Sequence, residues 1–236
     1  MAHEHFFYIP SSNISNDHFT LDNDEGHHAV NVLRLGVDDP VHLLYGEGMA
    51  YRGIIRSNGQ KVEGEIIETI EGLGEPKVSV HLAVGMIKRD RFEWLLEKAV
   101  ECGASSITPL IMDRCVKKSL NMDRSNVLVK TAAKQCGRSR FPTLNAPISL
   151  TEFLLKCENV ICLHSSGEAS LSSWVHENGS DHVTVIIGPE GDLSNYEMDL
   201  LKTNDISFLS LGNRRLRTET AAITALNILE HGVVHG

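Results

Sequence analysis

From residue 78 onward, short apolar segments alternate with segments whose apolar side chains recur at helical spacing. The pattern is clearest between Arg89 and Cys102, where apolar residues stand at i, i+3, i+4, i+7 and i+8 and the helix is expected to end at Gly103. Strands that alternate with helices favour a mostly parallel α/β sheet. The expected strands are 78–86, 106–112, 159–163, 182–187 and 206–211, and the expected helices are 89–102, 121–136, 149–156, 194–203 and 219–231.

The N-terminal segment has a different rhythm. Turn residues separate short apolar segments there, which predicts strands at 6–9, 41–45, 49–55 and 62–67 in a small antiparallel sheet or barrel. Residues 27–34 are expected to be helical, with Gly36 as the stop. Glycines and a proline between residues 70 and 77 break the pattern, so we expect one domain over residues 1–72 and a second over residues 73–236.

The composition indicates a soluble globular protein, because 42% of the 236 residues are hydrophobic and 22% are charged. No apolar run approaches the roughly 20 residues that cross a bilayer, and the first residues lack the features of a signal peptide. We therefore expect a cytoplasmic protein without a membrane segment. The five cysteines are odd in number and form no CxxC pair, so free thiols are expected. The adjacent His27 and His28 diverge by about 100° on a helix, so no metal site is expected.

The charges are segregated along the chain. The net charge is −9, yet residues 1–72 hold four basic and twelve acidic side chains, whereas residues 77–140 hold thirteen basic and six acidic ones. Basic clusters of this kind track a phosphate backbone in nucleic-acid-binding proteins, and they also occur on solvated helix faces. The charge pattern alone leaves both interpretations open.

A glycine-rich turn follows the expected strand 182–187. It reads Gly188-Pro-Glu-Gly-Asp192, and the loop contains two acidic residues and no lysine. Glu190 and Asp192 would repel a phosphate, which argues against a P-loop or a dinucleotide site. The loop better suits a neutral or cationic ligand, such as an adenosine held by backbone groups or a sulfonium centre. The alternative is a tight turn in which Asp192 caps the next helix.

A second strand-to-helix passage, residues 209–222, contains three arginines, namely Arg214, Arg215 and Arg217. Because ligands bind outside the carboxyl ends of strands in an open α/β sheet, both loops are expected to line one crevice. Guanidinium groups at such an edge suit a phosphate or a base. Thr218 and Glu219 have an alternative explanation as helix-capping residues. For Arg138 and Arg140, near a helix end, a structural role and an RNA contact are equally open.

Several motifs in one order resemble the small-subunit (16S) ribosomal RNA uridine-N3 methyltransferases, the RsmE family of the SPOUT superfamily. The resemblance covers nearly the whole chain. The most distinctive motifs are Ile187-Gly-Pro-Glu-Gly191 and Leu211-Gly-Asn-Arg-Arg-Leu-Arg-Thr-Glu-Thr-Ala221, and Lys98-Ala-Val-Glu-Cys-Gly-Ala104 and Gln135-Cys-Gly-Arg138 also match.

The resemblance implies a fold and a cofactor. The N-terminal domain is expected to be an RNA-binding PUA-like β-barrel, followed by a SPOUT-type α/β domain with a C-terminal trefoil knot. The family works as a homodimer that holds S-adenosylmethionine in the knot loops. Carried over to this sequence, the cofactor-binding residues are Leu163, His164, Ile187, Gly188, Pro189, Glu190, Gly191, Leu211, Gly212, Arg214 and Leu216.

The resemblance also implies a reaction, the methylation of N3 of a uridine in 16S rRNA, with the small ribosomal subunit as the expected partner. Arg217 is expected to stabilise negative charge on the uracil carbonyl groups, and Glu219 to accept the N3 proton. The expected RNA contacts are Arg34, Lys88, Arg89, Arg114, Arg138 and Arg140. A rival hypothesis is a non-catalytic RNA-binding or ribosome-assembly protein with the same fold. The acidic loop disfavours a third, an enzyme acting on nucleotide phosphates.

Overall fold

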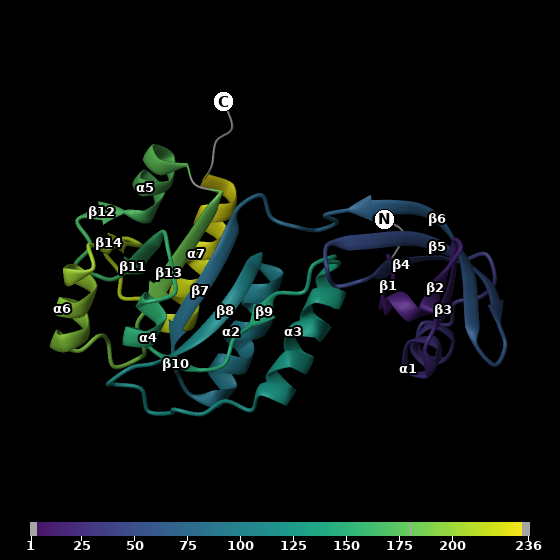
Figure 1. Ribbon diagram of the computed structural model, residues 1–236, viewed down its shortest axis with the longest axis horizontal. Helices are drawn as coiled ribbons and strands as arrows, with labels where there is room; N and C mark the ends of the chain where they lie inside the picture. The colour runs from purple at the N-terminus through teal and green to yellow at the C-terminus, as the bar shows by residue number, and fades with distance from the viewer. Residues whose placement is uncertain (1–3, 180, 233–236) are drawn as a thin grey trace. The chain divides into compact units, whose positions relative to one another are not determined.

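The computed structural model describes residues 4–179 and 181–232 (Figure 1). The chain divides into two compact units. The first consists of residues 1–75 together with Ala133–Phe141, and the second of Pro76–Ala132 together with the residues from Pro142 onward. From the sequence we expected a single domain boundary near residue 72. The sequence pattern does not indicate that residues 133–141 belong to the first unit.

The first unit is built on a six-stranded sheet in the order β1-β4-β5-β6-β3-β2. Neighbouring strands are antiparallel except β1 and β4, which confirms the antiparallel character expected for this segment. One apolar core beneath the sheet includes Phe7, Phe19, Leu43 and Ile55. The elements are β1 (Phe6–Tyr8), η1 (Ser11–Asn13), β2 (Ile14–Ser15), β3 (His18–Leu21), α1 (Asn23–His27), η2 (His28–Val32), β4 (Pro40–Leu44), β5 (Met49–Asn58) and β6 (Val62–Glu71).

The helix expected at residues 27–34 begins earlier and ends earlier. The side chain of Asp22 accepts a hydrogen bond from the backbone N–H of Glu25 at 2.8 Å and so caps α1. After α1 the chain continues as the π-helical turn η2, and Arg34 adopts a left-handed φ of 59°, which ends the helical segment. Gly26 inside α1 obscured this start, because an interior glycine lowers helix propensity.

A buried ion pair links the two chain segments that make up the first unit. Arg138 Nη2 lies 2.8 Å from Glu75 Oε2, and the two side chains are only 3% and 16% exposed. Glu75 also accepts a hydrogen bond from the backbone N–H of Arg140 at 2.8 Å. The expected RNA contact at Arg138 is therefore wrong: the guanidinium is buried and paired with a carboxylate. Arg140 keeps an exposed side chain.

The second unit contains a sheet whose neighbouring strands are all parallel, in the order β10-β8-β7-β13-β11-β14-β12, with β9 beside β8. This confirms the parallel α/β prediction. The elements are β7 (Ser79–Gly85), α2 (Arg89–Glu101), β8 (Ala104–Ile111), α3 (Met122–Cys136, whose last turn belongs to the first unit), β9 (Thr143–Leu144), β10 (Ile148–Ser149), α4 (Leu150–Leu154), β11 (Val160–Leu163), β12 (Ala169–Ser170), α5 (Leu171–Asn178), β13 (His182–Ile187), α6 (Asn195–Thr203), β14 (Ser207–Ser210) and α7 (Thr218–Gly232).

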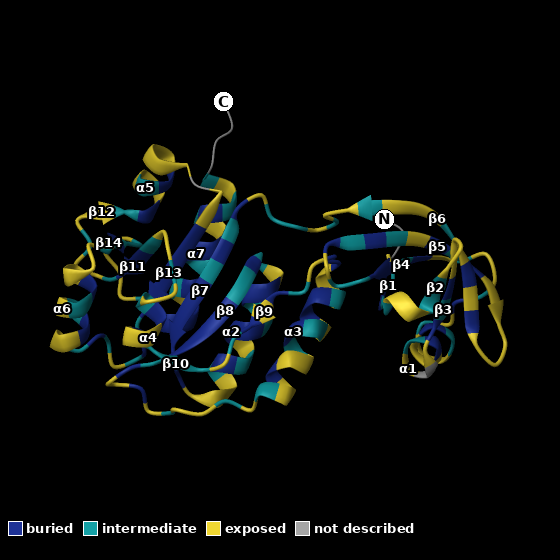
Figure 2. Ribbon diagram, in the orientation of Figure 1, coloured by how far each residue is buried: buried dark blue, intermediate teal, exposed yellow. Residues whose placement is uncertain are grey.

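Helices cover both faces of this sheet. Helices α2 and α7 pack against each other and against β7, β8 and β13. On the other face, α4 and α6 contribute Leu150, Phe153 and Leu201 to an apolar cluster that includes Ala83 of β7 and Ile186 of β13. The strands β7, β8 and β13 are accordingly buried along most of their length, whereas the helices are exposed on their outer sides (Figure 2). This double cover explains why these strands are nearly continuous apolar runs.

Strand β12 and helix α5 were not expected from the sequence. Helix α5 is short, its N-cap is Ser170, and only Leu171 and Val175 are buried, so it has little apolar periodicity. Strand β14 lies between β11 and β12 in the sheet, although β11 and β12 follow each other in the chain. Their connection passes so close to β14 that a Cβ at Gly167 would lie 2.5 Å from the carbonyl carbon of Leu209.

Candidate functional site

A cavity of about 470 Å³ lies at the carboxyl ends of β11, β13 and β14, which are neighbours in the sheet. The two strand-to-helix passages singled out in the sequence both line it, as expected for strand ends in a parallel sheet. The lining residues are Arg91, Leu163, His164, Ser165, Ile187, Gly188, Pro189, Glu190, Asp192, Leu211, Gly212, Arg214, Arg215, Leu216, Arg217, Thr218 and Ala221.

The structure brings nearly all of the expected cofactor residues to this cavity. Gly191 is the exception, because its backbone faces Arg114, whose Nη1 donates a hydrogen bond to the Gly191 carbonyl oxygen at 3.0 Å. Gly212 has a φ of 105°, a conformation that favours glycine and lets the chain turn at the cavity edge. The remaining expected residues line the cavity: Leu163, His164, Ile187, Gly188, Pro189, Glu190, Leu211, Gly212, Arg214 and Leu216.

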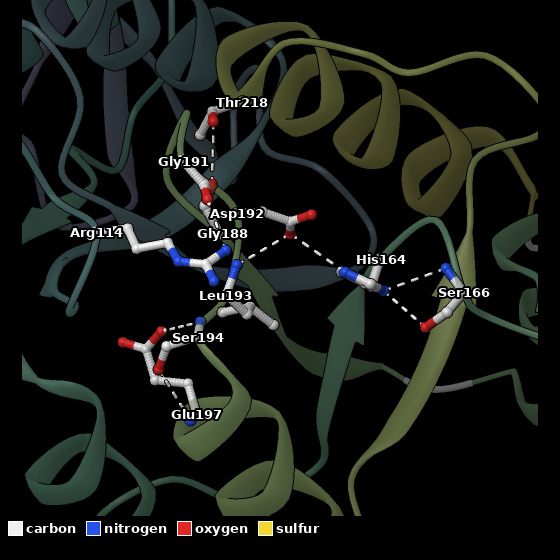
Figure 3. A network of polar contacts seen from close by, with 10 residues as sticks. All are labelled: Arg114, His164, Ser166, Gly188, Gly191, Asp192, Leu193, Ser194, Glu197 and Thr218. Atoms are coloured by element: carbon white, nitrogen blue, oxygen red, sulfur yellow. Dashed lines mark hydrogen bonds and ion pairs between the residues drawn. The ribbon is translucent and has the colours of Figure 1, made fainter.

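Asp192 joins two of the cavity loops (Figure 3). Its Oδ1 lies 3.1 Å from Nε2 of His164 and accepts a hydrogen bond from the backbone N–H of Leu193 at 2.9 Å. The alternative role as a cap of α6 is wrong, because Ser194 is the N-cap and forms a capping box with Glu197. Asp192 is therefore available to the loops rather than to the helix.

Thr218 connects the start of α7 to the glycine-rich turn. Its hydroxyl donates a hydrogen bond to the carbonyl oxygen of Gly188 at 3.0 Å (Figure 3). Thr218 is the first residue of α7, and the carbonyl of Arg217 accepts the helical bond from Ala221 at 2.8 Å. The N-cap interpretation of Thr218 is therefore wrong, and its side chain holds two cavity loops together instead.

The sequence did not single out Arg91 as a cofactor-site residue, although it stood in a basic cluster just after an expected strand. This residue of α2 lines the cavity and forms an ion pair with Glu190. Its Nε also lies 3.8 Å from Oε1 of Glu219. Its place in the chain could have located it, because the first turn of the helix after β7 lies at the same edge of the sheet as the other cavity loops.

Glu219 is buried behind this arginine. Its side chain is 10% exposed, and Oε2 has no hydrogen-bond partner among the described residues. Glu219 is also not among the residues that line the cavity. By contrast, the three arginines of the 212–217 loop are exposed, and none of the ion pairs found between described residues includes them.

The expected RNA contacts lie on both units. Arg34 is exposed in the first unit, and Lys88, Arg89 and Arg114 are exposed in the second. Arg89 is already engaged by Glu93, whose Oε1 accepts a hydrogen bond from Arg89 Nε at 2.8 Å. Lys88 and Arg114 form no ion pair with a described residue, which leaves their charges available to a phosphate backbone.

None of the five cysteines is among the residues that line the cavity. None of them forms a disulfide with a described residue, and burial raises the pKa of the Cys162 thiol to about 12, so this thiol stays protonated. Among the described residues there is no group of three or more His, Cys, Asp or Glu side chains placed to hold a metal ion. Within the same residues, no helix is both long and apolar enough to cross a bilayer.

Comparison with known proteins identifies the family. Residues 74–230 match the model of an RNA methyltransferase domain, and residues 21–67 match that of an RNA methyltransferase PUA domain. The ribosomal RNA small subunit methyltransferase E of Rickettsia conorii is 31% identical, over 93% of this chain and 92% of its own. The chain belongs to the ribosomal RNA small subunit methyltransferase E family. The family member from Bacillus subtilis is 29% identical over 90% of each chain.

Two solved methyltransferase structures are similar to the chain. A putative methyltransferase from Legionella pneumophila, in complex with the bound cofactor SAM, has a TM-score of 0.83 at 30% identity, over 97% of both chains. A ribosomal RNA small subunit methyltransferase E from Neisseria gonorrhoeae, bound to S-adenosyl methionine, has the same TM-score at 27% identity, over 95% of both chains. The expected resemblance and its cofactor class are therefore confirmed.

Proposed function

We propose that the chain transfers a methyl group from S-adenosylmethionine to N3 of a uridine in the 16S rRNA of the small ribosomal subunit. The observation that carries the proposal is the cavity at the ends of β11, β13 and β14, in a chain whose structural relatives hold this cofactor. The alternative, a non-catalytic RNA-binding protein, needs no such cavity.

The residues present fit the cofactor in size and in charge. The cavity volume falls in the range of about 300–1,000 Å³ that is usual for small-molecule sites. Glu190 and Asp192 offer carboxylates, whereas Arg214 and Arg215 offer guanidinium groups from another loop. A zwitterionic ligand that also bears a sulfonium finds partners for charges of both signs there. When bound, S-adenosylmethionine supplies a methyl group on a positively charged sulfur.

Arg217 is our candidate for the residue that faces the base. N3 of uracil carries a hydrogen, so negative charge develops on the neighbouring carbonyl oxygens as that proton leaves. An exposed guanidinium at the cavity edge stabilises such charge. The target base must be unstacked to reach it, so the substrate is a single-stranded or extruded nucleotide.

Glu219 needs a revised role. The expectation that it accepts the N3 proton requires contact with the base, but its carboxylate is buried and stands behind Arg91 rather than at the cavity wall. We propose that Glu219 is a positioning residue that holds Arg91, and that the proton leaves to solvent at the open side of the cavity.

The finer features of the fold are also proposals. Strand β14 lies between two consecutive strands of the chain, and the loop that joins them passes close to Leu209, which supports threading of the following segment as a trefoil knot. In the first unit, Phe7 lies on β1 at one edge of the sheet and Phe19 lies on β3, next to the strand at the other edge. Both belong to the same apolar core, which supports closure of the sheet into a PUA-like barrel.

The proposed partners are the small ribosomal subunit and a second copy of the chain, in the cytoplasm. A depression of about 540 Å³ on α7, beside Ser172 of α5, supports a homodimer because apolar side chains line part of it. Ile223 and Ile228 contribute these side chains, and Thr224 lies between them. Apolar side chains of this kind favour a contact with another protein surface.

Radioactive methyl transfer from labelled S-adenosylmethionine to small ribosomal subunits that lack the modification tests the function. We expect one methyl group per subunit, on N3 of a uridine, and mapping of the modified base identifies the nucleotide. The Arg217→Ala variant should fold normally and bind the cofactor but transfer methyl at a rate at least about a hundredfold lower. Absence of transfer by the unchanged protein, with RNA binding intact, would favour the non-catalytic alternative.

A further inference from the structure

Arg91 stands between two carboxylates that reach it from different loops. Glu190 comes from the turn after β13 and Glu219 from the first turn of α7, and both lie within ion-pair distance of the Arg91 guanidinium. Arg91 and Glu190 line the cavity, while Glu219 is buried behind them. The Arg91 guanidinium is thus paired with two carboxylates at this part of the cavity.

The charges in this trio do not cancel. One guanidinium and two carboxylates leave a net charge of one negative unit when both glutamates are ionised. A carboxylate buried to this degree is costly without a cation beside it, and Arg91 supplies that cation for Glu219. The arginines of the 212–217 loop also line the cavity, but none of them forms an ion pair with Glu190 or Glu219.

The reaction changes the charge of the cofactor. Transfer breaks the bond between the methyl carbon and sulfur and forms one between that carbon and N3, and the electron pair of the broken bond stays on sulfur. A sulfonium therefore becomes a neutral thioether, while the N3 proton passes to solvent. The substrate S-adenosylmethionine and the product S-adenosylhomocysteine differ only by one methyl group and one positive charge.

We propose that the trio Glu190–Arg91–Glu219 determines specificity, because its one net negative charge makes the cavity favour the sulfonium substrate over the thioether product. This inference rests on the proposed function. The negative wall attracts the cofactor before transfer and loses that attraction afterwards, so the product leaves more readily. Arg91 acts here by limiting the negative charge to one unit and by holding both carboxylates in place.

Isothermal titration calorimetry with S-adenosylmethionine and, separately, with S-adenosylhomocysteine tests the proposal at about pH 8, well above the usual pKa of a carboxyl group. The measured quantity is the ratio of the two dissociation constants. In Glu190→Gln the trio becomes neutral, and we expect the preference for S-adenosylmethionine to fall at least about threefold. In Arg91→Met both carboxylates lose their cation, and the preference is expected to rise by a similar factor, whereas Arg91→Lys keeps it near that of the unchanged protein.

Matched controls separate this role from a general effect of charge. Glu97→Gln and Lys98→Gln remove one charge of each sign from α2 at an ion pair away from the cavity, so the ratio should not change. An unchanged ratio in Glu190→Gln overturns the proposal, because that variant keeps an oxygen to accept from Arg91 and is expected to fold. If the unchanged protein bound neither ligand, the proposed function itself would fail; if it binds and transfers methyl while the ratios stay equal, only this inference fails.

Discussion

The hydroxyl of Thr218 donates a hydrogen bond to the carbonyl oxygen of Gly188 across 3.0 Å, and so the first residue of α7 holds the turn that follows β13. Both residues line the cavity. In Thr218→Val the shape is kept but the Gly188 carbonyl loses its partner, which costs about 1–3 kcal/mol. We expect weaker binding of S-adenosylmethionine by about tenfold, measured by calorimetry.

Thr218→Ser provides the matched control for this bond. It keeps the hydroxyl, so cofactor affinity should stay close to that of the unchanged protein. Equal affinities for all three proteins would show that the bond does not organise the cavity.

The ion pair between Arg138 and Glu75 should matter for stability rather than for RNA binding. Removing one partner of a buried pair leaves an uncompensated charge, so Arg138→Met is expected to lower the free energy of unfolding of the first unit by about 3–5 kcal/mol. Differential scanning calorimetry measures the loss. The control is Arg52→Met, which removes a half-exposed partner of Glu68 in the same unit and should cost less than about 1 kcal/mol. Similar losses in the two variants would contradict the assignment.

RNA binding should depend on the exposed cations Lys88 and Arg114 of the second unit. The double variant Lys88→Gln/Arg114→Gln is expected to bind small-subunit rRNA more weakly and to reduce the slope of log K against log salt by about 0.7 for each phosphate that the protein no longer neutralises. A filter-binding titration at several salt concentrations measures both effects. Lys156→Gln/Lys202→Gln removes the same charge from exposed positions elsewhere in the second unit. If both double variants bind with equally reduced affinity, the binding face has been misplaced.

Acid should destabilise the second unit through His81. Burial lowers the pKa of His81 below its usual value, with a smaller contribution from His182, and its Nε2 lies 2.7 Å from the hydroxyl of Thr108. The unfolded chain takes up a proton at about pH 6.5 that the folded chain resists, so stability falls as the pH drops below that value.

Urea unfolding at about pH 7.5 and pH 5.5 tests this dependence on His81. His81→Gln should lose less stability between the two pH values than the unchanged protein, because its side chain does not titrate. His176→Gln, at an exposed position of α5, should behave like the unchanged protein. An identical loss in all three proteins would rule out a contribution from His81.

The fold of the second unit was largely readable from the sequence, since strands buried on both faces and amphipathic helices leave periodic signals. The crevice could be predicted for a related reason: parallel strands end at one edge, so the loops after residues 187 and 211 had to meet. The sequence did not predict Arg91 as a cavity residue, because it pairs with Glu190, 99 positions away, and no local pattern encodes that contact. Arg138 was misjudged because a sequence displays charge but not burial.

The start of α1 and the whole of α5 were missed for local reasons. An interior Gly26 masked a helix that Asp22 caps, and α5 buries too few apolar residues to show a period. Threading of a chain through a loop has no local signature in a sequence, which is why the proposed knot rests on family resemblance and on the placement of β14.

The return of residues 133–141 to the first unit has a practical consequence for dissecting the protein. A fragment that stops at residue 75 would retain Glu75 but lack Arg138, and it would also lack Phe141, whose ring packs beside Tyr8. Such a fragment would leave a carboxylate and an apolar face without their native neighbours. Residues 1–75 of this enzyme are therefore not expected to fold as an independent domain. Insertions or fusions that separate the two chain segments of the first unit would remove contacts inside its core.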